Sequence, residues 1–385
     1  MALVPMRVIL EATDTYNYAQ GAFNVNAVAQ AKAVIEVHQM FRSAAIIQGA
    51  DLANGFMGGA TNFMKATAED KKRGAKNIAD AVKKIAEEST IPIALHLDHG
   101  LTYDSCVSAI EGGYTSVMID GSSLPFEENV ALTREVVRYA HERGVTVEGE
   151  LGVLAGVEDH VFSSTSTYTN PLKAVEFFKK TGVDALAISY GTRHGANKGK
   201  DTVIRKEIAI AIKECLRHEQ IRGVLVSHGS STVPRYIVDE INALGGDVQD
   251  AFGIKMAQLQ EVAKCGIGKI NVDTDIRLAV TRNFRELFNE VPSLRTSASI
   301  GEVWELLQNN PKAFDPRVFL TPVMHTVMTG EVLDTDVGLL MARMEAGVKE
   351  VVGSLIINFE SYGKAPLIEE VSLDEMARRY KREGR

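Results

Sequence analysis

Eight short apolar runs alternate along the chain with amphipathic, charged stretches. The runs, which we interpret as strands, lie near residues 21–26, 44–49, 91–98, 116–120, 145–151, 185–190, 223–228 and 269–273. The amphipathic stretches, which we interpret as helices, lie near residues 28–42, 72–88, 126–143, 170–181, 205–219, 234–244 and 275–289. Short apolar runs are typical of strands buried on both faces, and their alternation with helices favours a parallel sheet with right-handed crossovers. Eight such units predict a (β/α)8 TIM barrel.

Two connections are longer than a minimal strand–helix unit, and the barrel pattern ends before the chain does. Residues 50–72 are rich in Gly, Ala and Asn and are predicted to form a loop over the barrel mouth. Residues 152–170 carry several Ser and Thr and are predicted to form a mobile lid. We expect residues 1–290 to form the barrel domain. We expect residues 291–385 to form a C-terminal helical extension packed on the barrel or on a neighbouring subunit.

Charge and cysteine content narrow the class of protein. The chain carries 42 Lys and Arg against 50 Asp and Glu, and this net charge of -8 argues against a nucleic-acid-binding surface. The N-terminus has no long apolar segment, so neither a signal peptide nor a membrane span is expected. Three widely spaced cysteines are not typical of a disulfide framework and fit a reducing compartment. We therefore expect a cytoplasmic protein that binds neither nucleic acid nor membrane.

Histidines stand at the ends of three predicted strands. His99, His194 and His228 follow the third, sixth and seventh apolar runs. In a parallel barrel the carboxyl ends of the strands share one face, where the reactive groups of such barrels lie. A single histidine is more often a satisfied core or surface residue, but three at strand ends favour a shared site. Three imidazole ligands with an open fourth position are typical of catalytic zinc. His96, inside the third run, is predicted to have a structural role.

Carboxylates follow the same strand ends. Asp98 stands beside His99, and its position next to a cation makes it a candidate general acid or base. Asp120 and Glu150 close the fourth and fifth runs, where they could contact a metal ion or form salt bridges inside the barrel. Glu158 lies in the predicted lid, from which a loop carboxylate can swing in to accept a proton.

Small polar residues and glycines follow the last three runs and indicate a phosphorylated ligand. The segments are His-Gly-Ala-Asn-Lys-Gly-Lys (194–200), His-Gly-Ser-Ser-Thr (228–232) and Asn-Val-Asp-Thr-Asp (271–275). Loops after the last strands of this barrel commonly hold phosphate through backbone N–H groups and hydroxyls. Each segment alone would be only a turn or a helix cap, whereas together they favour a phosphate site.

Six segments together resemble the class II fructose-bisphosphate aldolases. They are Ala-Leu-His-Leu-Asp-His-Gly (94–100), Val-Glu-Gly-Glu-Leu-Gly (147–152), Gly-Thr-Arg-His-Gly (191–195), Ser-His-Gly-Ser-Ser (227–231), Lys-Ile-Asn-Val-Asp-Thr-Asp (269–275) and Phe-Asp-Pro-Arg (314–317). The resemblance extends from about residue 20 to residue 320. It implies zinc-dependent, Schiff-base-free cleavage of fructose 1,6-bisphosphate to dihydroxyacetone phosphate and glyceraldehyde 3-phosphate.

The resemblance also implies roles for individual residues. The zinc ligands would be His99, His194 and His228, with Glu150 and Asp120 nearby as an alternative or second-metal shell. Asp98 would exchange the proton of the C4 hydroxyl, and Glu158 would handle the C3 proton of dihydroxyacetone phosphate. The residues expected on the substrate and its phosphates are Asn24, Gly195, Lys198, Gly229, Ser231, Asn271, Asp273, Thr274 and Arg317.

The resemblance also implies cofactors and an assembly. One catalytic zinc ion is expected, together with a second divalent site and a monovalent cation. Arg317 would reach the far phosphate across a dimer interface, so a homodimer or a higher homo-oligomer is expected. The physical reasoning agrees with the metal, because a dication stabilises the enediolate left by C3–C4 cleavage.

Departures from the family pattern keep other readings open. Ala50 stands where the family usually has Ser, and the chain continues for nearly seventy residues beyond Arg317. These features motivate an alternative aldolase for tagatose 1,6-bisphosphate or another ketose phosphate. A zinc hydrolase of the amidohydrolase type would carry a His-x-His pair after the first strand, where this chain has Phe-Asn-Val-Asn. A class I aldolase would need a desolvated lysine that forms an imine, but no lysine stands at a strand end: Lys198 is expected in a loop and Lys269 at the start of the eighth run. A catalytically silent zinc-binding barrel is the remote alternative.

Overall fold

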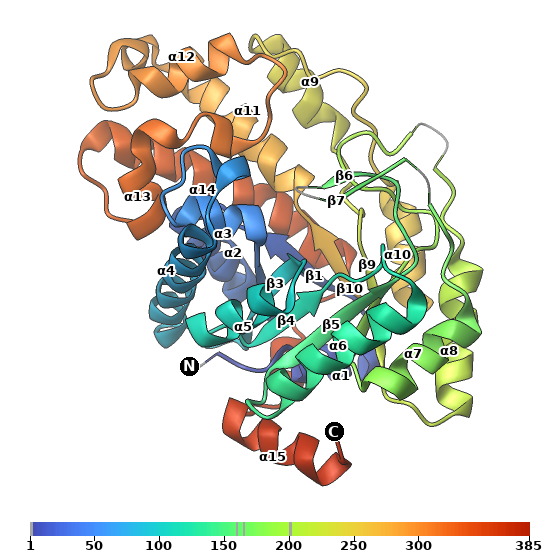
Figure 1. Ribbon diagram of the computed structural model, residues 1–385. Coiled ribbons are helices and arrows are strands. Elements are labelled where there is room, and N and C mark those ends of the chain that lie inside the picture. Colours follow the sequence, from blue (N-terminus) through green and yellow to red (C-terminus); the bar gives the residue numbers. More distant parts are fainter. Residues whose placement is uncertain (1–2, 159–160, 165, 200–201) are drawn as a thin grey trace.

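The computed structural model contains a closed barrel of eight parallel strands (Figure 1). It describes residues 3–158, 161–164, 166–199 and 202–385, without the side chains of residues 157, 158, 161 and 162. The barrel strands are β1 (Gln20–Asn24), β2 (Ala45–Ala50), β3 (Ile93–Gly100), β4 (Ser116–Ile119), β5 (Thr146–Leu151), β8 (Ala185–Ile188), β9 (Val224–Ser227) and β10 (Ile267–Val272). Around the barrel their order is β1-β10-β9-β8-β5-β4-β3-β2. The predicted TIM barrel is confirmed, with each strand within about three residues of its expected place.

Helices cover the outside of the barrel. They are α2 (Val28–Met40), α4 (Ala68–Glu87), α5 (Tyr103–Gly112), α6 (Phe126–His141), α7 (Pro171–Thr181), α8 (Lys206–His218), α9 (Arg235–Ala243), α10 (Met256–Lys264) and α11 (Thr274–Glu290). All of them except α5 and α10 coincide with a predicted amphipathic stretch. Large apolar side chains of the strands point outward into the main core beneath these helices, for example Ile47, Leu95 and Val147. Apolar packing between the strands and the surrounding helices therefore stabilises the barrel. Polar side chains can occupy its interior near the mouth.

The prediction that residues 50–72 form a loop is wrong. This segment contains α3 (Asp51–Met57), the 3-10 turn η1 (Phe63–Lys65) and the start of α4. The glycines that favoured a loop instead allow α3 and α4 to touch, because a Cβ on Gly58, which follows α3, would lie 1.9 Å from the carbonyl oxygen of Asp70 in α4. Glycine is favoured both where two helices approach closely and in flexible loops, so its presence does not distinguish the two. The predicted lid contains a two-stranded hairpin of β6 (Gly156–Glu158) and β7 (Val161–Ser163).

Beyond residue 290 the chain forms α12 (Gly301–Asn309), α13 (Met324–Thr329), α14 (Thr335–Asn358) and α15 (Leu373–Glu383), with 3-10 turns at Pro292–Thr296, Pro316–Val318, Thr321–Val323 and Ala365–Leu367. The long helix α14 packs along α2 and α11 and so belongs to the shell around the barrel. The division of the chain at residue 290 stays a prediction. No described helix is long and apolar enough to cross a membrane.

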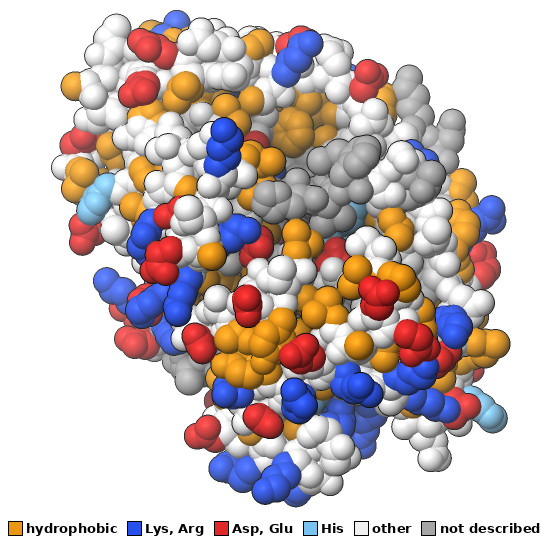
Figure 2. Space-filling view, viewed as in Figure 1, with side chains coloured by type: hydrophobic (Ala, Val, Ile, Leu, Met, Phe, Trp, Pro, Cys, Tyr) orange, Lys and Arg blue, Asp and Glu red, His pale blue; other side chains and the backbone are white. Residues whose placement is uncertain are grey.

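The N-terminal end of the barrel is closed by helices from both ends of the chain. Helix α1 (Met6–Tyr16), which the strand pattern did not predict, packs its apolar side chains against Ala22, Ala94 and Ala187 inside the barrel. Helix α15 adds Met376 and Tyr380 to the same cluster and lies at the lower end of the molecule in Figure 1. In Figure 2, Lys and Arg side chains gather around this end. The opposite end, at the carboxyl ends of the strands, is the mouth.

Candidate active site

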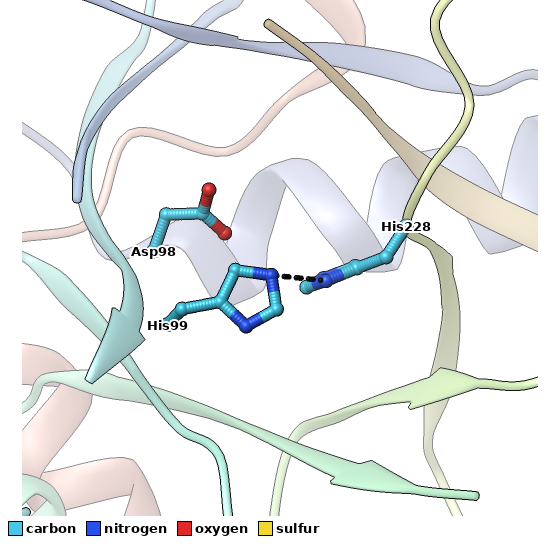
Figure 3. A group of neighbouring side chains, drawn as sticks. All are labelled: Asp98, His99 and His228. Atoms are coloured by element: carbon cyan, nitrogen blue, oxygen red, sulfur yellow. Dashed lines mark hydrogen bonds between the residues drawn. The ribbon is translucent and has the colours of Figure 1, made fainter. Parts of the chain in front are cut away.

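Asp98 and His99, neighbours at the end of β3, both reach the interior of the mouth. In a regular strand they would point to opposite faces. The pairing of β3 with β4 shifts between Leu97 and Gly100, and His99 has a φ of +49°, in the left-handed region. That conformation costs about 1–3 kcal/mol for a residue other than glycine and is concentrated at functional sites. Figure 3 shows the Asp98 carboxylate and the His99 ring on the same side of the strand, facing His228.

The three histidines predicted to share a site come together in the mouth. His228 directly follows β9, whereas His194 lies on the loop after β8, where its N–H donates to the carbonyl oxygen of Ala155. The ring centroids of His99 and His228 are 4.7 Å apart, and those of His99 and His194 are 5.3 Å apart. All three rings are buried. His99 Nε2 and His228 Nδ1 face one another at 3.0 Å.

In His99 and His228, the ring nitrogen that does not face the other histidine contacts a carboxylate. His99 Nδ1 lies 3.0 Å from Asp120 Oδ2, and the backbone N–H and hydroxyl of Ser122 donate to the other oxygen of Asp120. His228 Nε2 lies 2.8 Å from Glu148 Oε1. Metal-binding histidines are usually oriented in this way, by a hydrogen bond from the ring nitrogen that does not face the ion.

Among the residues that the structure describes, two groups of side chains could hold an ion. Asp98, His99 and His228 offer ligand atoms within 4.8 Å of one another, and so do His99, Asp120 and Glu150. Because His99 belongs to both groups, the two positions are adjacent. Glu150 Oε2 is also 3.6 Å from His228 Nδ1. Every predicted metal ligand except His194 therefore belongs to one of these groups, and the ring of His194 packs edge-on against His99.

Amide side chains hold the Asp98 carboxylate. Asn24 Nδ2 donates to one oxygen at 2.9 Å, and Asn271 Nδ2 donates to the other at 3.0 Å. Gln48 Nε2 in turn donates to Asn24 Oδ1 at 2.7 Å. Asp98 is thus fixed by neutral donors and keeps acceptor capacity for a proton, as a general base requires.

Buried charges of opposite sign shift the pKa values in the mouth. Burial lowers the pKa of His99, but the carboxylates of Asp98, Asp120 and Glu150 outweigh it and raise that pKa well above its usual value. Burial raises the pKa of Glu148, but Lys269 and the bond from His228 outweigh it and hold the pKa below its usual range. Four buried carboxylates face the histidines here, an arrangement that a bound dication would neutralise.

Residues predicted to bind phosphate surround a pocket beside the histidines. Gly195, Asp273, Thr274 and Arg317 line this pocket of about 330 Å³ together with Leu52, Phe63, Met64, Ala196, Arg277, Phe314 and Asp315. The loops after β8 and β9 touch behind it, because a Cβ on Gly229 would lie 2.4 Å from the carbonyl oxygen of Arg193. Lys198 Nζ donates to that same oxygen at 2.6 Å, and Ser231 Oγ accepts the N–H of Asp273. Thr274 begins α11, so the helix N-terminus opens on the pocket.

Arg317 lines this pocket within its own chain. Its guanidinium bonds to Asp315 and lies over the ring of Phe63, with Cζ 4.4 Å from the centroid. Burial raises the pKa of Asp315, but Arg277 and Arg317 lower it to about 2. The predicted reach of Arg317 across a dimer interface stays a prediction. The side chain of Glu158, the predicted loop base, lies outside the described residues.

Neither Lys269 nor Arg277 was assigned to the site from the sequence. Lys269, expected at the start of its strand, is the third residue of β10 and donates to Glu148 at 2.8 Å. Arg277 joins Asp273 and Asp315. Lys269 could have been identified from the sequence, because it is a charged side chain inside an otherwise apolar run. Such a side chain is expected to be buried, and a buried charge requires a partner of opposite charge. His96 has the structural contact expected of it, with Nδ1 2.8 Å from Ser116 Oγ.

Comparison with known proteins gives one consistent family. Residues 4–364 match the sequence model of the family described as fructose-bisphosphate aldolase class-II. Fructose-bisphosphate aldolase of Giardia intestinalis is 38% identical over 84% of this chain and 88% of its own length. The enzyme of that name from Treponema pallidum is 40% identical over 79% of this chain and 86% of its own. The one from Nostoc sp. is 35% identical over 99% of this chain and 96% of its own. Residues beyond 320 therefore have counterparts in relatives too.

Solved structures share the fold. The YdjI aldolase from Escherichia coli K12 superposes with a TM-score of 0.64 at 24% identity, covering 94% of this chain and 99% of its own. Fructose-bisphosphate aldolase from Campylobacter jejuni superposes with a TM-score of 0.65 at 18% identity, covering 94% of this chain and 96% of its own. At these identities the likeness concerns the barrel architecture.

Proposed function

The chain belongs to the class-II fructose-bisphosphate aldolase family, and we propose that it reversibly cleaves fructose 1,6-bisphosphate with a bound zinc ion. The products are dihydroxyacetone phosphate and glyceraldehyde 3-phosphate. The observation that carries the metal part of the proposal is the approach of His99 Nε2 and His228 Nδ1 to 3.0 Å, with Asp98 in the same group. Buried imidazole nitrogens backed by carboxylates fit zinc better than magnesium.

His99, His194 and His228 would hold the zinc ion. Asp120 and Glu150 would serve as an alternative or second position, because they share His99 within 4.8 Å. Zinc, when bound, would supply positive charge that stabilises the negative charge developing on the substrate during cleavage. The residues of the chain perform the proton transfers and hold the substrate.

Asp98 would take the proton of the C4 hydroxyl. The C3–C4 bond then breaks, its electron pair passes toward the C2 carbonyl, and C4 leaves as the aldehyde of glyceraldehyde 3-phosphate. A proton delivered to C3 by Glu158 completes dihydroxyacetone phosphate. Asn24 and Asn271 support this role, because they hold the Asp98 carboxylate by one hydrogen bond on each oxygen. General base catalysis of this kind contributes about 10²–10⁴-fold in rate.

The phosphate of dihydroxyacetone phosphate would bind between the loops after the last three strands. Gly195 and Thr274 line the pocket and offer backbone N–H groups or a hydroxyl there, and Gly229, Lys198 and Ser231 lie on the adjoining loops. Asn271 and Asp273 would orient the substrate oxygens. Arg317 would bind the second phosphate, and its position on the pocket wall supports a phosphate role. A phosphate at a helix N-terminus beside arginine is a recurrent arrangement.

Cleavage of fructose 1,6-bisphosphate by the purified protein, with and without a chelator, tests the proposal. We expect chelation to abolish cleavage and added zinc to restore it. Cleavage that resists complete removal of divalent metal would contradict the metal part. Zinc binding without cleavage of this sugar would contradict the substrate.

We further propose a cytoplasmic homodimer or higher homo-oligomer. The role of Arg317 at the far phosphate is the reason, since the family resemblance places this residue at a subunit interface. Light scattering during gel filtration measures the mass. A mass near the 41.9 kDa of one chain in the active enzyme would contradict an oligomer.

A further inference from the structure

A buried ion pair crosses the barrel directly beneath the histidines. Lys269 on β10 and Glu148 on β5 are 2.8 Å apart, although β9 and β8 separate their strands in the sheet. Neither side chain has any exposed surface. Glu148 uses its second oxygen on His228 Nε2, also at 2.8 Å. Lysine, glutamate and histidine thus form a chain that ends at one of the proposed zinc ligands.

The contact with Glu148 determines which nitrogen of the His228 ring carries the proton. An ionised carboxylate only accepts hydrogen bonds, so at 2.8 Å the proton lies on Nε2. In a neutral ring Nδ1 is then unprotonated, and Nδ1 is the nitrogen that faces His99 at 3.0 Å. A metal ligand has to be unprotonated at the nitrogen that binds the ion.

A competing donor sits on the other side of the same nitrogen. Asn271 Nδ2 is 3.2 Å from His228 Nε2, and the same amide group donates to Asp98, which fixes its orientation. Without the carboxylate of Glu148, this amide would donate to Nε2 and move the ring proton to Nδ1. The ring would then present a proton to the ion.

Lys269 stabilises the ionised form of Glu148 that accepts the hydrogen bond from His228 Nε2. An ionised carboxylate without exposed surface requires a compensating charge, and Lys269 supplies it through one hydrogen bond. His96 Nε2 lies 3.5 Å from the same oxygen of Glu148, while its other nitrogen is bonded to Ser116. Neither Glu148 nor Lys269 lines the phosphate pocket.

We propose that Glu148 and Lys269 are positioning residues that hold the proton of His228 on Nε2 and thereby present Nδ1 to the zinc ion. The inference rests on the proposed metal site, but the proton position can be measured in the metal-free protein. It adds two residues to the site that act through His228 and do not touch the substrate.

Nitrogen NMR of the metal-free full-length protein, labelled at histidine nitrogens, tests the inference. In the wild type we expect the His228 signals of a ring protonated at Nε2. In Glu148→Gln we expect signal from the Nδ1-protonated form and zinc affinity about ten- to a hundredfold weaker, the usual effect of removing such a partner. Competition with a chromophoric chelator measures the affinity. Glu148→Asp, which keeps the carboxylate, should retain more of the Nε2 form than Glu148→Gln.

Two further variants keep the test decisive. Should Glu148→Gln fail to fold, the double variant Glu148→Met, Lys269→Met removes both charges together, which buried pairs tolerate better than loss of one partner. Ser116→Ala is the matched control, because it removes a buried partner of His96 and leaves His228 untouched. An unchanged Nε2 proton and unchanged zinc affinity in the folded Glu148 variants would overturn the inference. A wild type that binds no zinc would instead overturn the proposed function, while the proton position still decides the role of Glu148.

Discussion

Two buried charge clusters lie at opposite ends of the same barrel, and they are built differently. The lower cluster, at the N-terminal end, consists of Asp184 with His141, Tyr380 and Arg385. Asp184 accepts hydrogen bonds from Tyr380 Oη at 3.0 Å, Arg385 Nη2 at 2.8 Å and the backbone N–H of Val147 at 2.8 Å, and contacts His141 Nε2 at 3.0 Å. Beside it, Arg7 forms two bonds to Glu383, each of 2.8 Å.

The mouth cluster, which comprises Asp98, His99, Asp120, Glu148, Glu150 and His228, has a different balance. In the lower cluster the carboxylate of Asp184 pairs with Arg385. In the mouth Lys269 pairs with Glu148 alone, Asp98 is held by neutral amides, and two imidazole nitrogens face one another. The lower cluster is complete with its own side chains, and so it serves stability. The mouth cluster is suited to an added cation, and we therefore assign the proposed chemistry to it. This division matches the usual separation of stability and function between the two ends of such barrels.

The largest expected effect comes from His228→Ala. Loss of this ligand should remove zinc and lower kcat by at least about 10³-fold, the equivalent of about 4 kcal/mol. Metal analysis and a cleavage assay on the same sample measure both. The ring is buried and bonded to Glu148, so its loss should also lower the thermal unfolding midpoint of the metal-free protein, and zinc content and kcat are therefore expressed per folded molecule. Full zinc content in the variant would contradict the ligand assignment.

Asp98→Ala should separate the proton transfer from metal binding. We expect zinc to be retained and kcat to fall by about 10²–10⁴-fold, because general base catalysis is lost while the histidines remain. The zinc content and cleavage rate of Asp98→Ala are measured and compared with those of His228→Ala. A rate near that of the wild type would show that another group takes the C4 hydroxyl proton.

In the lower cluster, Asp184→Asn should have the opposite profile. The variant leaves Arg385 without its buried anionic partner, so the free energy of unfolding should drop by about 3 kcal/mol, while zinc content and kcat per folded molecule stay unchanged. Urea unfolding and active-site titration measure the two quantities. A loss of kcat without a loss of stability would break the proposed division between the two ends.

The smallest expected effect is a change with pH in the stability difference between the wild type and Asp184→Asn. Burial raises the pKa of Asp184, but His141 and Arg385 outweigh it and hold the pKa well below its usual range. A group with a depressed folded-state pKa contributes stability above its unfolded pKa of about 3.9 and loses that contribution as the pH falls further. The stability gap between wild type and Asp184→Asn should therefore be full at neutral pH and shrink below about pH 4. A constant gap down to pH 2.5, measured by urea unfolding, would contradict this coupling.

The two ends also differ in how much of them could be predicted from sequence. The mouth residues follow strand ends, and a strand end is a local pattern of apolar residues followed by polar ones. His99, His194 and His228 were therefore identified together. The left-handed turn at His99, which lets it share a space with Asp98, has no local signature apart from the adjacent Gly100.

The parts that could not be predicted depend on pairs far apart in the chain. Lys269 and Glu148 are separated by 121 positions, and Tyr380 and Asp184 by 196. Each looks like an ordinary charged or aromatic residue until the barrel closes. Helix α3 was missed for a related reason, since Gly58 permits a helix contact that composition alone cannot distinguish from a loop.

Anomalous X-ray scattering at the zinc edge, from crystals of the purified protein, tests the central claim most directly. We expect a single strong peak about 2.0–2.1 Å from His99 Nε2 and His228 Nδ1, with His194 as the third ligand, and no peak at Asp184. A catalytically active, zinc-containing crystal whose peak lies away from these histidines would contradict the account.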